Sequence, residues 1–174
     1  TWDEKILSFV PENGVIPNMA VVGAANGLMD IHSCFASAQK EADLIIKTSG
    51  KTAKKKRLPK VEITKYEISP KWSVDGKGRA WLDYQNDVTV KDIQQSVQEN
   101  FKSVEHMKRY TTQGMAIDQG KNSNVASLAI LADATGRGIP ETGTTTFRPP
   151  FVPVSIASMG KNAQGMGFAP QRCT

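Results

Sequence analysis

Residues 89–114, TVKDIQQSVQENFKSVEHMKRYTTQG, carry the clearest structural signal in this chain of 174 residues. Thr89 is followed three positions later by Asp92. This is the spacing of a capping box, in which two side chains satisfy backbone N–H groups at the start of a helix. The apolar residues after the cap recur at helical spacing: Val90, Ile93 and Val97. The pattern predicts a short amphipathic helix that begins directly after Thr89.

Two more helices are predicted downstream from their caps and stop signals. Ser103 can cap a helix that ends before Gly114, and Ser123 or Asn124 can begin another that ends before Gly136. The apolar residues assigned to their buried faces are Val104, Met107 and Tyr110 in the first and Val125, Leu128, Ala129 and Leu131 in the second. We therefore expect residues 81–160 to form a small helical domain.

The segment that follows, residues 137–153, is rich in Pro, Gly and Thr and predicts an extended loop. It concentrates hydroxyl groups at Thr142–Thr146 and carries Arg148 before two prolines. A loop this polar is costly to keep ordered unless it docks onto something, so we expect a docking strap. Pro153 can then open a last short helix that runs to Met159.

A second chemical signal lies near the N-terminus, where Met19–Val22 predicts a short buried strand and Ile31–Gly50 a helix with its stop. The turn between them is rich in glycine, and backbone N–H groups at a helix start can bind a phosphate. The candidate dinucleotide-binding residues are Gly23, Ala24, Ala25, Asn26, Gly27, Met29 and Asp30. A tight turn that binds nothing explains the same residues equally well, because the full GxGxxG fingerprint is absent.

The predicted strand needs neighbours that residues 1–18 do not supply. Residues 1–50 are therefore predicted to be the C-terminal edge of a larger Rossmann-like α/β domain. The expected fold class is α+β and mainly helical, with this α/β edge followed by the small helical domain.

The net charge of +5 comes from one segment. Residues 47–60 hold seven basic residues and no acidic one, so the rest of the chain has a net charge of −2. The run contains no aromatic residue, whereas nucleic-acid binding needs a basic face with aromatic or groove-reading elements. Residues 51–80 are therefore predicted to be a solvated basic linker with a possible strand at Val61–Ile68. A polyanion-binding module is the alternative.

The two cysteines, Cys34 and Cys173, are far apart. They cannot build a disulfide framework or a four-thiolate metal site. No apolar run approaches the roughly 18 residues of a membrane span, and no signal-peptide pattern opens the chain. These observations favour a cytoplasmic protein without a metal, nucleic-acid or membrane partner.

The order of motifs from Asp83 to Lys121 resembles the helical [2Fe–2S] fold of bacterioferritin-associated ferredoxin. In that fold one cysteine pair precedes a Val-Thr cap and another follows a Lys-Arg-Tyr-Thr segment. The positions that match these cysteines here are Asp83, Gln85, Asp118 and Ser123. Iron–sulfur clusters need thiolate ligands, so the resemblance implies a scaffold that has lost its cluster. A ferredoxin-like [2Fe–2S] electron-transfer module is the alternative function.

A closer resemblance rests on motifs that occur in one order along the chain. They are Trp2-Asp-Glu4, Phe9-Val-Pro11, Gly23-Ala-Ala-Asn-Gly27, Asp87-Val-Thr89, Ser103–Thr112, Gly114–Lys121 and Thr142–Pro150. Together they resemble the middle of the alpha subunit of heterotetrameric sarcosine oxidase. The resemblance covers nearly all of the chain outside the lysine-rich linker.

In that family, sarcosine is oxidatively demethylated on an FAD in the beta subunit, and electrons pass to an FMN near the alpha–beta interface and then to oxygen. Glycine and hydrogen peroxide are formed, and the methyl carbon leaves as formaldehyde or is captured on tetrahydrofolate. The complete alpha subunit carries NAD. The resemblance thus implies the beta, gamma and delta subunits and the rest of the alpha subunit as partners. Residues 1–50 would end a dinucleotide-binding domain, and residues 161–174 would lead toward a folate-binding domain.

The resemblance implies a structural, cofactor-adjacent role for this chain. The chain lacks the first dinucleotide motif, the amine-oxidising flavin site and the folate domain, so we expect no catalytic residue, no cofactor bound by the chain alone and no activity in isolation. Thr144, Thr145 and Arg148 would help enclose the flavin at the subunit interface, or would brace two domains. Lys108 and Arg109 form either a solvated helix face or an interface or phosphate clamp.

Overall fold

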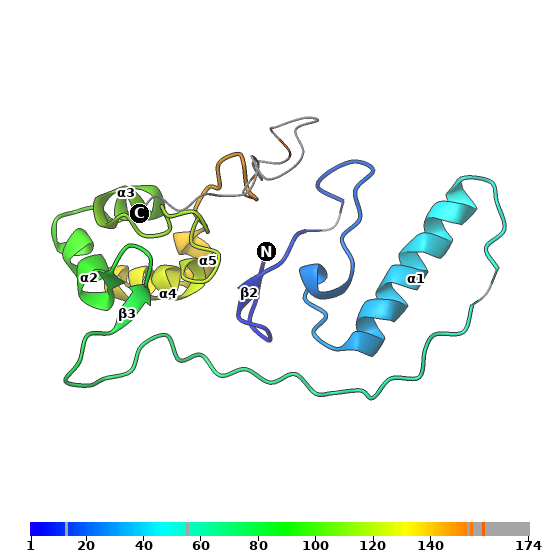
Figure 1. The fold of residues 1–174 in the computed structure, drawn as a ribbon, viewed down its shortest axis with the longest axis horizontal. Coiled ribbons are helices and arrows are strands. Elements are labelled where there is room, and N and C mark those ends of the chain that lie inside the picture. Colours follow the sequence, from blue (N-terminus) through cyan, green and yellow to red (C-terminus); the bar gives the residue numbers. More distant parts are fainter. Residues whose placement is uncertain (13, 55, 153, 155–157, 159–174) are drawn as a thin grey trace, which may run out of the picture. The chain divides into compact units, whose positions relative to one another are not determined.

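The computed structural model describes residues 1–12, 14–54, 56–152, 154 and 158. The chain divides into two compact units, Thr1–Lys71 and Trp72–Thr174 (Figure 1). The described residues form five α-helices and two small antiparallel sheets, so the mixed, mainly helical class is confirmed. The predicted last helix from Pro153 to Met159 lies outside the described residues apart from positions 154 and 158, as does the linker at 161–174.

The first unit begins with a two-stranded antiparallel sheet. Strands β1 (Trp2–Asp3) and β2 (Ser8–Phe9) pair Trp2 with Phe9, and the rings of these two residues meet edge to face at 5.0 Å between centroids. The 3₁₀ helix η1 (Gly23–Asn26) precedes helix α1 (Ile31–Thr48). The Asp30 carboxylate caps α1 by accepting a hydrogen bond from the Ser33 N–H at 2.8 Å.

The predicted helix in this unit is confirmed, and Gly50 follows its end with a left-handed φ of +71°. The predicted strand at residues 19–22 is wrong, because these residues belong to no strand. Val22 has extended backbone angles, yet no strand pairs with it among the described residues. Extended backbone becomes a strand only when a neighbour takes up its hydrogen bonds. The possible strand at Val61–Ile68 is absent for the same reason.

The second unit begins with a hairpin that leads into a helix. Strands β3 (Trp81–Asp83) and β4 (Val88–Thr89) are antiparallel, and α2 (Val90–Gln98) follows directly. Thr89 and Asp92 form the predicted capping box: the Asp92 carboxylate accepts from the Thr89 N–H at 2.7 Å, and the Thr89 hydroxyl accepts from the Asp92 N–H at 3.4 Å. Local polar groups therefore define where α2 begins.

Three further helices complete the second unit: α3 (Val104–Thr111), α4 (Asn124–Thr135) and α5 (Ile139–Thr142). The prediction of an extended loop over 137–153 is wrong at α5, where Pro140 lies in the first turn of a short helix. Ser103 caps α3 as predicted, with its hydroxyl accepting from the His106 N–H at 3.2 Å. The predicted stop of α3 is displaced, because Thr112 takes the left-handed conformation two residues before Gly114. Gly136 ends α4 as predicted, in the left-handed conformation.

The core of the second unit is built around α4, which packs against α2 and α5. The largest apolar side chains that are almost completely buried are Val88, Ile93, Met107, Leu128 and Leu131. They come from β4, α2, α3 and α4, so one small core holds the hairpin and the helices together. None of the helices in the described part has both the length and the apolar composition that a bilayer crossing requires.

Candidate functional site

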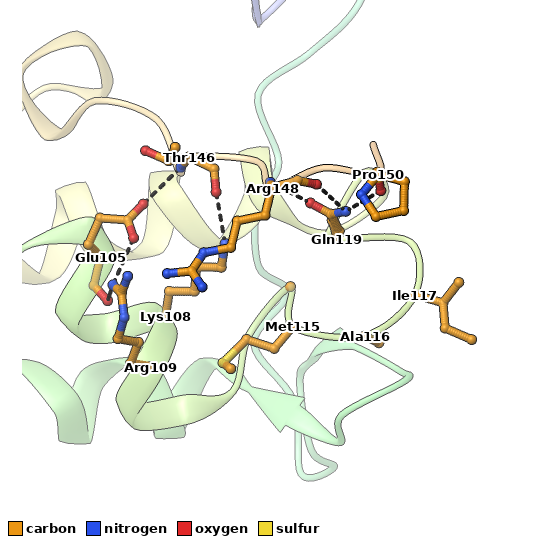
Figure 2. Close-up of a pocket in the computed structure, with 11 residues that line it drawn as sticks. Glu105, Lys108, Arg109, Met115, Ala116, Ile117, Gln119, Thr146, Arg148 and Pro150 are labelled. Atoms are coloured by element: carbon orange, nitrogen blue, oxygen red, sulfur yellow. Dashed lines mark hydrogen bonds and ion pairs between the residues drawn. The ribbon is translucent and has the colours of Figure 1, made fainter. Parts of the chain in front are cut away.

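A hollow of about 710 Å³ opens in the second unit between α3, the loop that follows it, and the predicted strap (Figure 2). Its lining residues are Glu105, Lys108, Arg109, Gly114, Met115, Ala116, Ile117, Gln119, Thr146, Arg148 and Pro150. Figure 2 shows the Arg148 side chain extending from the strap toward α3. Helix α3 and the loop directly after it thus form one concave surface with the strap, which lies about 30 positions further along the chain; a concave surface is the usual shape of a ligand site.

The middle of the strap is held by α3 through its backbone at Thr146. The Thr146 N–H donates to the Glu105 carboxylate at 2.8 Å, and the Thr146 carbonyl accepts from Lys108 Nζ at 3.2 Å. Glu105 and Lys108 lie on one face of α3 because residues three apart are neighbours on a helix. Two side chains of α3 therefore satisfy both polar backbone groups of Thr146.

The far end of the strap is held by the loop after α3. The Gln119 side chain accepts from the Arg148 N–H at 2.9 Å and donates to the carbonyls of Arg148 at 2.9 Å and Pro150 at 3.0 Å. Lys121 Nζ donates to the Phe151 carbonyl at 2.7 Å and lies 3.9 Å from the centroid of the Phe151 ring. The strap is therefore held at Thr146, Arg148, Pro150 and Phe151 by side chains of its own unit.

The hollow has an excess of positive charge. Arg109 is paired with Glu105 at 2.7 Å, whereas neither Lys108 nor Arg148 pairs with a carboxylate in the part of the chain that the structure describes. The Thr146 amide lowers the pKa of Glu105, and Arg109 and Lys108 lower it further against the opposing effect of burial. Glu105 is therefore ionised at neutral pH, and the three cations leave a net charge of about +2 around the hollow.

The other part of the lining is apolar. Met115 and Ile117 are 55% and 78% exposed, and Ala116 lies between them. A surface with unpaired cations on one side and apolar side chains on the other suits a flat organic molecule that carries an anionic group.

Three of the four positions that match the ferredoxin cysteines, Asp83, Asp118 and Ser123, use their side-chain oxygen atoms in hydrogen bonds within the fold. The Asp83 carboxylate accepts from the N–H groups of Gln85 at 2.9 Å and Gly114 at 2.8 Å. Asp118 accepts from the Gly120 N–H at 3.1 Å, and Ser123 accepts from the buried Gln113 amide at 2.9 Å. These oxygen atoms hold the loops together, so this donor set does not fit an iron–sulfur cluster.

Within the described ranges, no group of three or more His, Cys, Asp or Glu side chains is arranged to hold a metal ion.

Comparison with known proteins identifies the family. A sequence model described as "Sarcosine oxidase A3 domain" matches residues 77–163, which begin inside the second unit. The chain belongs to the sarcosine oxidase A3 domain family. The predicted relationship to sarcosine oxidase alpha subunits is thereby confirmed.

Named relatives extend the match beyond the A3 domain. The chain is 37% identical over 174 residues to "Sarcosine oxidase subunit alpha" of Rhizobium meliloti (strain 1021), a match that covers 98% of this chain and 18% of the relative. Proteins of the same name from Corynebacterium sp. strains U-96 and P-1 are 34% and 32% identical, each over 99% of this chain and 19% of the relative. The chain thus spans about a fifth of the length of these alpha subunits.

The A3 domain brings together only some of the residues predicted to face a flavin. Arg148 lines the hollow, but Thr144 is exposed, Thr145 is buried, and neither belongs to the lining. Thr146, rather than Thr144 or Thr145, is the threonine of the strap that lines the hollow. Composition alone could not identify which of three consecutive threonines lines the hollow, because that depends on the contacts of Thr146 with α3.

Several lining residues were missed by the sequence analysis. Glu105, Met115, Ala116, Ile117 and Gln119 lie within the motifs Ser103–Thr112 and Gly114–Lys121, but no site role was assigned to them from the sequence. Their nearness in sequence to Lys108 and Arg109 could have indicated that they line the same site, because a helix end and the loop after it share a surface. Lys108 and Arg109 both line the hollow, and Arg109 is paired there with Glu105.

The candidate dinucleotide residues lie in the first unit, apart from the A3 domain. Gly23–Asn26 form η1, Gly27 ends it in the left-handed conformation, and Met29 is 38% exposed. Asp30 caps α1, and the Ser33 hydrogen bonds lower the pKa of its carboxyl. The first-turn N–H of Ser33 is thus engaged by a side chain of the chain itself. The turn predicted from the glycines is present, but not the strand expected before it.

Proposed function

We propose that this chain is an internal part of the alpha subunit of a sarcosine oxidase complex that converts sarcosine to glycine with formation of hydrogen peroxide. The methyl carbon would leave as formaldehyde or as methylene-tetrahydrofolate. The support is the match to named alpha subunits along 98–99% of this chain. Because the chain spans about a fifth of those subunits, its own role is structural and cofactor-adjacent.

We assign the hollow in the A3 domain to one face of an FMN site that a beta subunit completes. The observation that carries this assignment is the pair of cations, Lys108 and Arg148, on two walls of a hollow whose third wall is apolar. A phosphate monoester carries a charge near −2 at neutral pH, which matches the positive charge of the lining. Bound there, FMN would relay electrons from the amine-oxidising FAD to oxygen.

In this assignment the residues of the chain bind, orient and shield. Lys108 and Arg148 bind the phosphate, and Arg148 can hold two of its oxygens at once. Met115 and Ile117 exclude water from one face of the ring system. Glu105 has a different role, since it neutralises Arg109 and fixes the strap.

The remaining cofactors and partners belong to parts of the complex outside this chain. NAD would bind a domain that residues 1–50 complete, joined through the linker at 51–80 to the helical domain at 81–160. Residues 161–174 would lead to a folate-binding domain for tetrahydrofolate. FAD would bind the beta subunit, and the gamma and delta subunits would complete the assembly.

The FMN assignment is tested by changing Arg148 in the complete complex. We expect the FMN content of the purified complex to fall in Arg148→Ala and, less severely, in Arg148→Lys, because lysine keeps the charge but loses the planar guanidinium. Arg137→Ala is the matched control, since Arg137 is an exposed arginine at the end of α4 that does not line the hollow. Wild-type FMN content in both Arg148 variants would refute the assignment, and lower thermal stability with that content would mean that Arg148 only braces the strap.

A further inference from the structure

We propose that Gln119 is a positioning residue that holds Arg148 so that its guanidinium reaches the anionic group of the ligand. This inference rests on the proposed function, because it needs an anion in the hollow. Lys108 and Arg148 were assigned direct contacts with the ligand, whereas Gln119 would act on the backbone of the strap.

The Gln119 carboxamide forms three hydrogen bonds with backbone groups of the strap. Its oxygen accepts from the Arg148 N–H, and its NH₂ group donates to the Arg148 and Pro150 carbonyls. A primary amide is the side chain that offers one acceptor and two donors in one plane. Glutamate would set oxygen atoms against both carbonyls, and methionine would leave all three strap groups without a protein partner.

Gln119 is itself anchored to the core of the A3 domain. Its N–H donates to the Ala116 carbonyl at 2.9 Å, and its carbonyl accepts from Asn124 Nδ2 at 3.1 Å. Asn124 is the first residue of α4, and its side-chain oxygen accepts from the buried Gln113 amide at 3.0 Å. A continuous series of hydrogen bonds therefore connects the helical core to the strap.

This connection limits where the Arg148 side chain can go. Arg148 is exposed, and a free arginine loses considerable side-chain entropy when it binds an anion. With both backbone groups of Arg148 bound by Gln119, only the side-chain torsions remain to be ordered. Ordering the backbone before the ligand arrives strengthens binding without any added contact.

A double-mutant cycle in the complete complex tests the inference, with riboflavin 5′-phosphate as the probe. The variants are Gln119→Met, Arg148→Ala and the double variant, and the apparent affinity for the flavin is measured after reconstitution. We expect about tenfold weaker binding in Gln119→Met from the loss of the strap hydrogen bonds. We also expect almost no additional effect of this change when Arg148 is already alanine.

Hydrogen exchange gives a readout that does not depend on the flavin. In Gln119→Met and in Gln119→Glu the strap should loosen, and exchange at the Arg148 amide should accelerate. Gln94→Glu is the matched control for the glutamate variant, since Gln94 is an exposed glutamine on α2. This control should leave both the exchange and the flavin affinity unchanged.

The outcomes separate the two proposals. If Arg148→Ala alone leaves flavin affinity unchanged, the FMN assignment fails. If Arg148→Ala weakens binding but Gln119→Met does not, the FMN assignment stands and the positioning role of Gln119 is wrong. A Gln119→Met effect of equal size with and without Arg148 also overturns the inference, because Gln119 would then act by another route.

Discussion

Asp83 accepts a hydrogen bond from the backbone N–H of Gly114 at 2.8 Å, across 31 positions of sequence. The same carboxylate accepts from the N–H groups of Gln85 at 2.9 Å and Asn86 at 3.3 Å. Asp83 is only 3% exposed, so this buried charge depends on these donors. The contact fastens the β3–β4 hairpin to the loop that carries Met115 and Gln119, and thereby supports one wall of the hollow.

Replacing Asp83 with asparagine should destabilise the second unit. The amide keeps one acceptor oxygen, but its NH₂ group faces N–H donors that then lose their partner. We expect a loss of about 2 kcal/mol in the free energy of unfolding, measured by urea denaturation. Asp133→Asn is the control, because Asp133 is an exposed carboxylate on α4, and it should unfold like the wild type. Equal stability of both variants would contradict a structural role for Asp83.

The same carboxylate should make stability depend on pH. Burial acts to raise the pKa of Asp83, but the hydrogen bonds from Gly114, Asn86 and Gln85 outweigh it and the pKa lies below its ordinary value. A lowered folded-state pKa contributes stability above the unfolded-state pKa of about 3.9, and this contribution is lost as pH falls through the folded-state value. Denaturation between pH 5 and 2 should therefore show a smaller loss of stability in Asp83→Asn than in the wild type.

Gly120 should tolerate no side chain. Its φ is +73°, and an added Cβ would lie 2.8 Å from the Gly114 Cα and in collision with the Asn124 side chain. Gly136 has a similar φ of +66° but open space around it. Alanine at Gly136 should cost about 1 kcal/mol for the left-handed backbone alone, whereas alanine at Gly120 should lose about 1–3 kcal/mol more from overpacking. Thermal unfolding of the two variants checks the difference, and equal melting temperatures would contradict this account.

The capping box of α2 should contribute measurably to stability. Thr89→Val keeps the shape of the side chain but removes the hydroxyl that accepts from the Asp92 N–H. We expect a loss of about 1 kcal/mol, measured by chemical denaturation. Thr89→Ser restores a capping hydroxyl and should recover most of that loss. If serine is as unstable as valine, the methyl group rather than the hydroxyl stabilises this helix start.

The dinucleotide prediction can be tested in the complete alpha subunit. If the turn at Gly23 faces NAD, Gly23→Ala should lower the NAD content of the purified protein, because an added Cβ narrows the approach of the cofactor to the backbone. Gly14→Ala is the control, since Gly14 has a similar left-handed φ and nothing within 4 Å of the added atom. Equal NAD content in both variants would mean that the turn binds no dinucleotide.

The helices could be predicted from the sequence because their signals are local. A cap acts on N–H groups within three residues, and a left-handed glycine acts at its own position, so Thr89, Ser103 and Gly136 were assigned to their places without knowledge of the fold. The strand at residues 19–22 could not be decided in this way. Its pairing depends on a second segment, and no partner strand occurs in the described chain.

The family relationship also follows from the sequence, because the motifs and their order along the chain can be recognised without a structure. Only the tertiary structure decided which side chains meet at the hollow. Thr146 reaches Glu105 across 41 positions and Arg148 reaches Gln119 across 29, and no periodicity in the sequence encodes these distances. Contacts of this kind arise when the packed helices fix where two loops emerge, so the residues that hold the predicted strap are determined only once the core has formed.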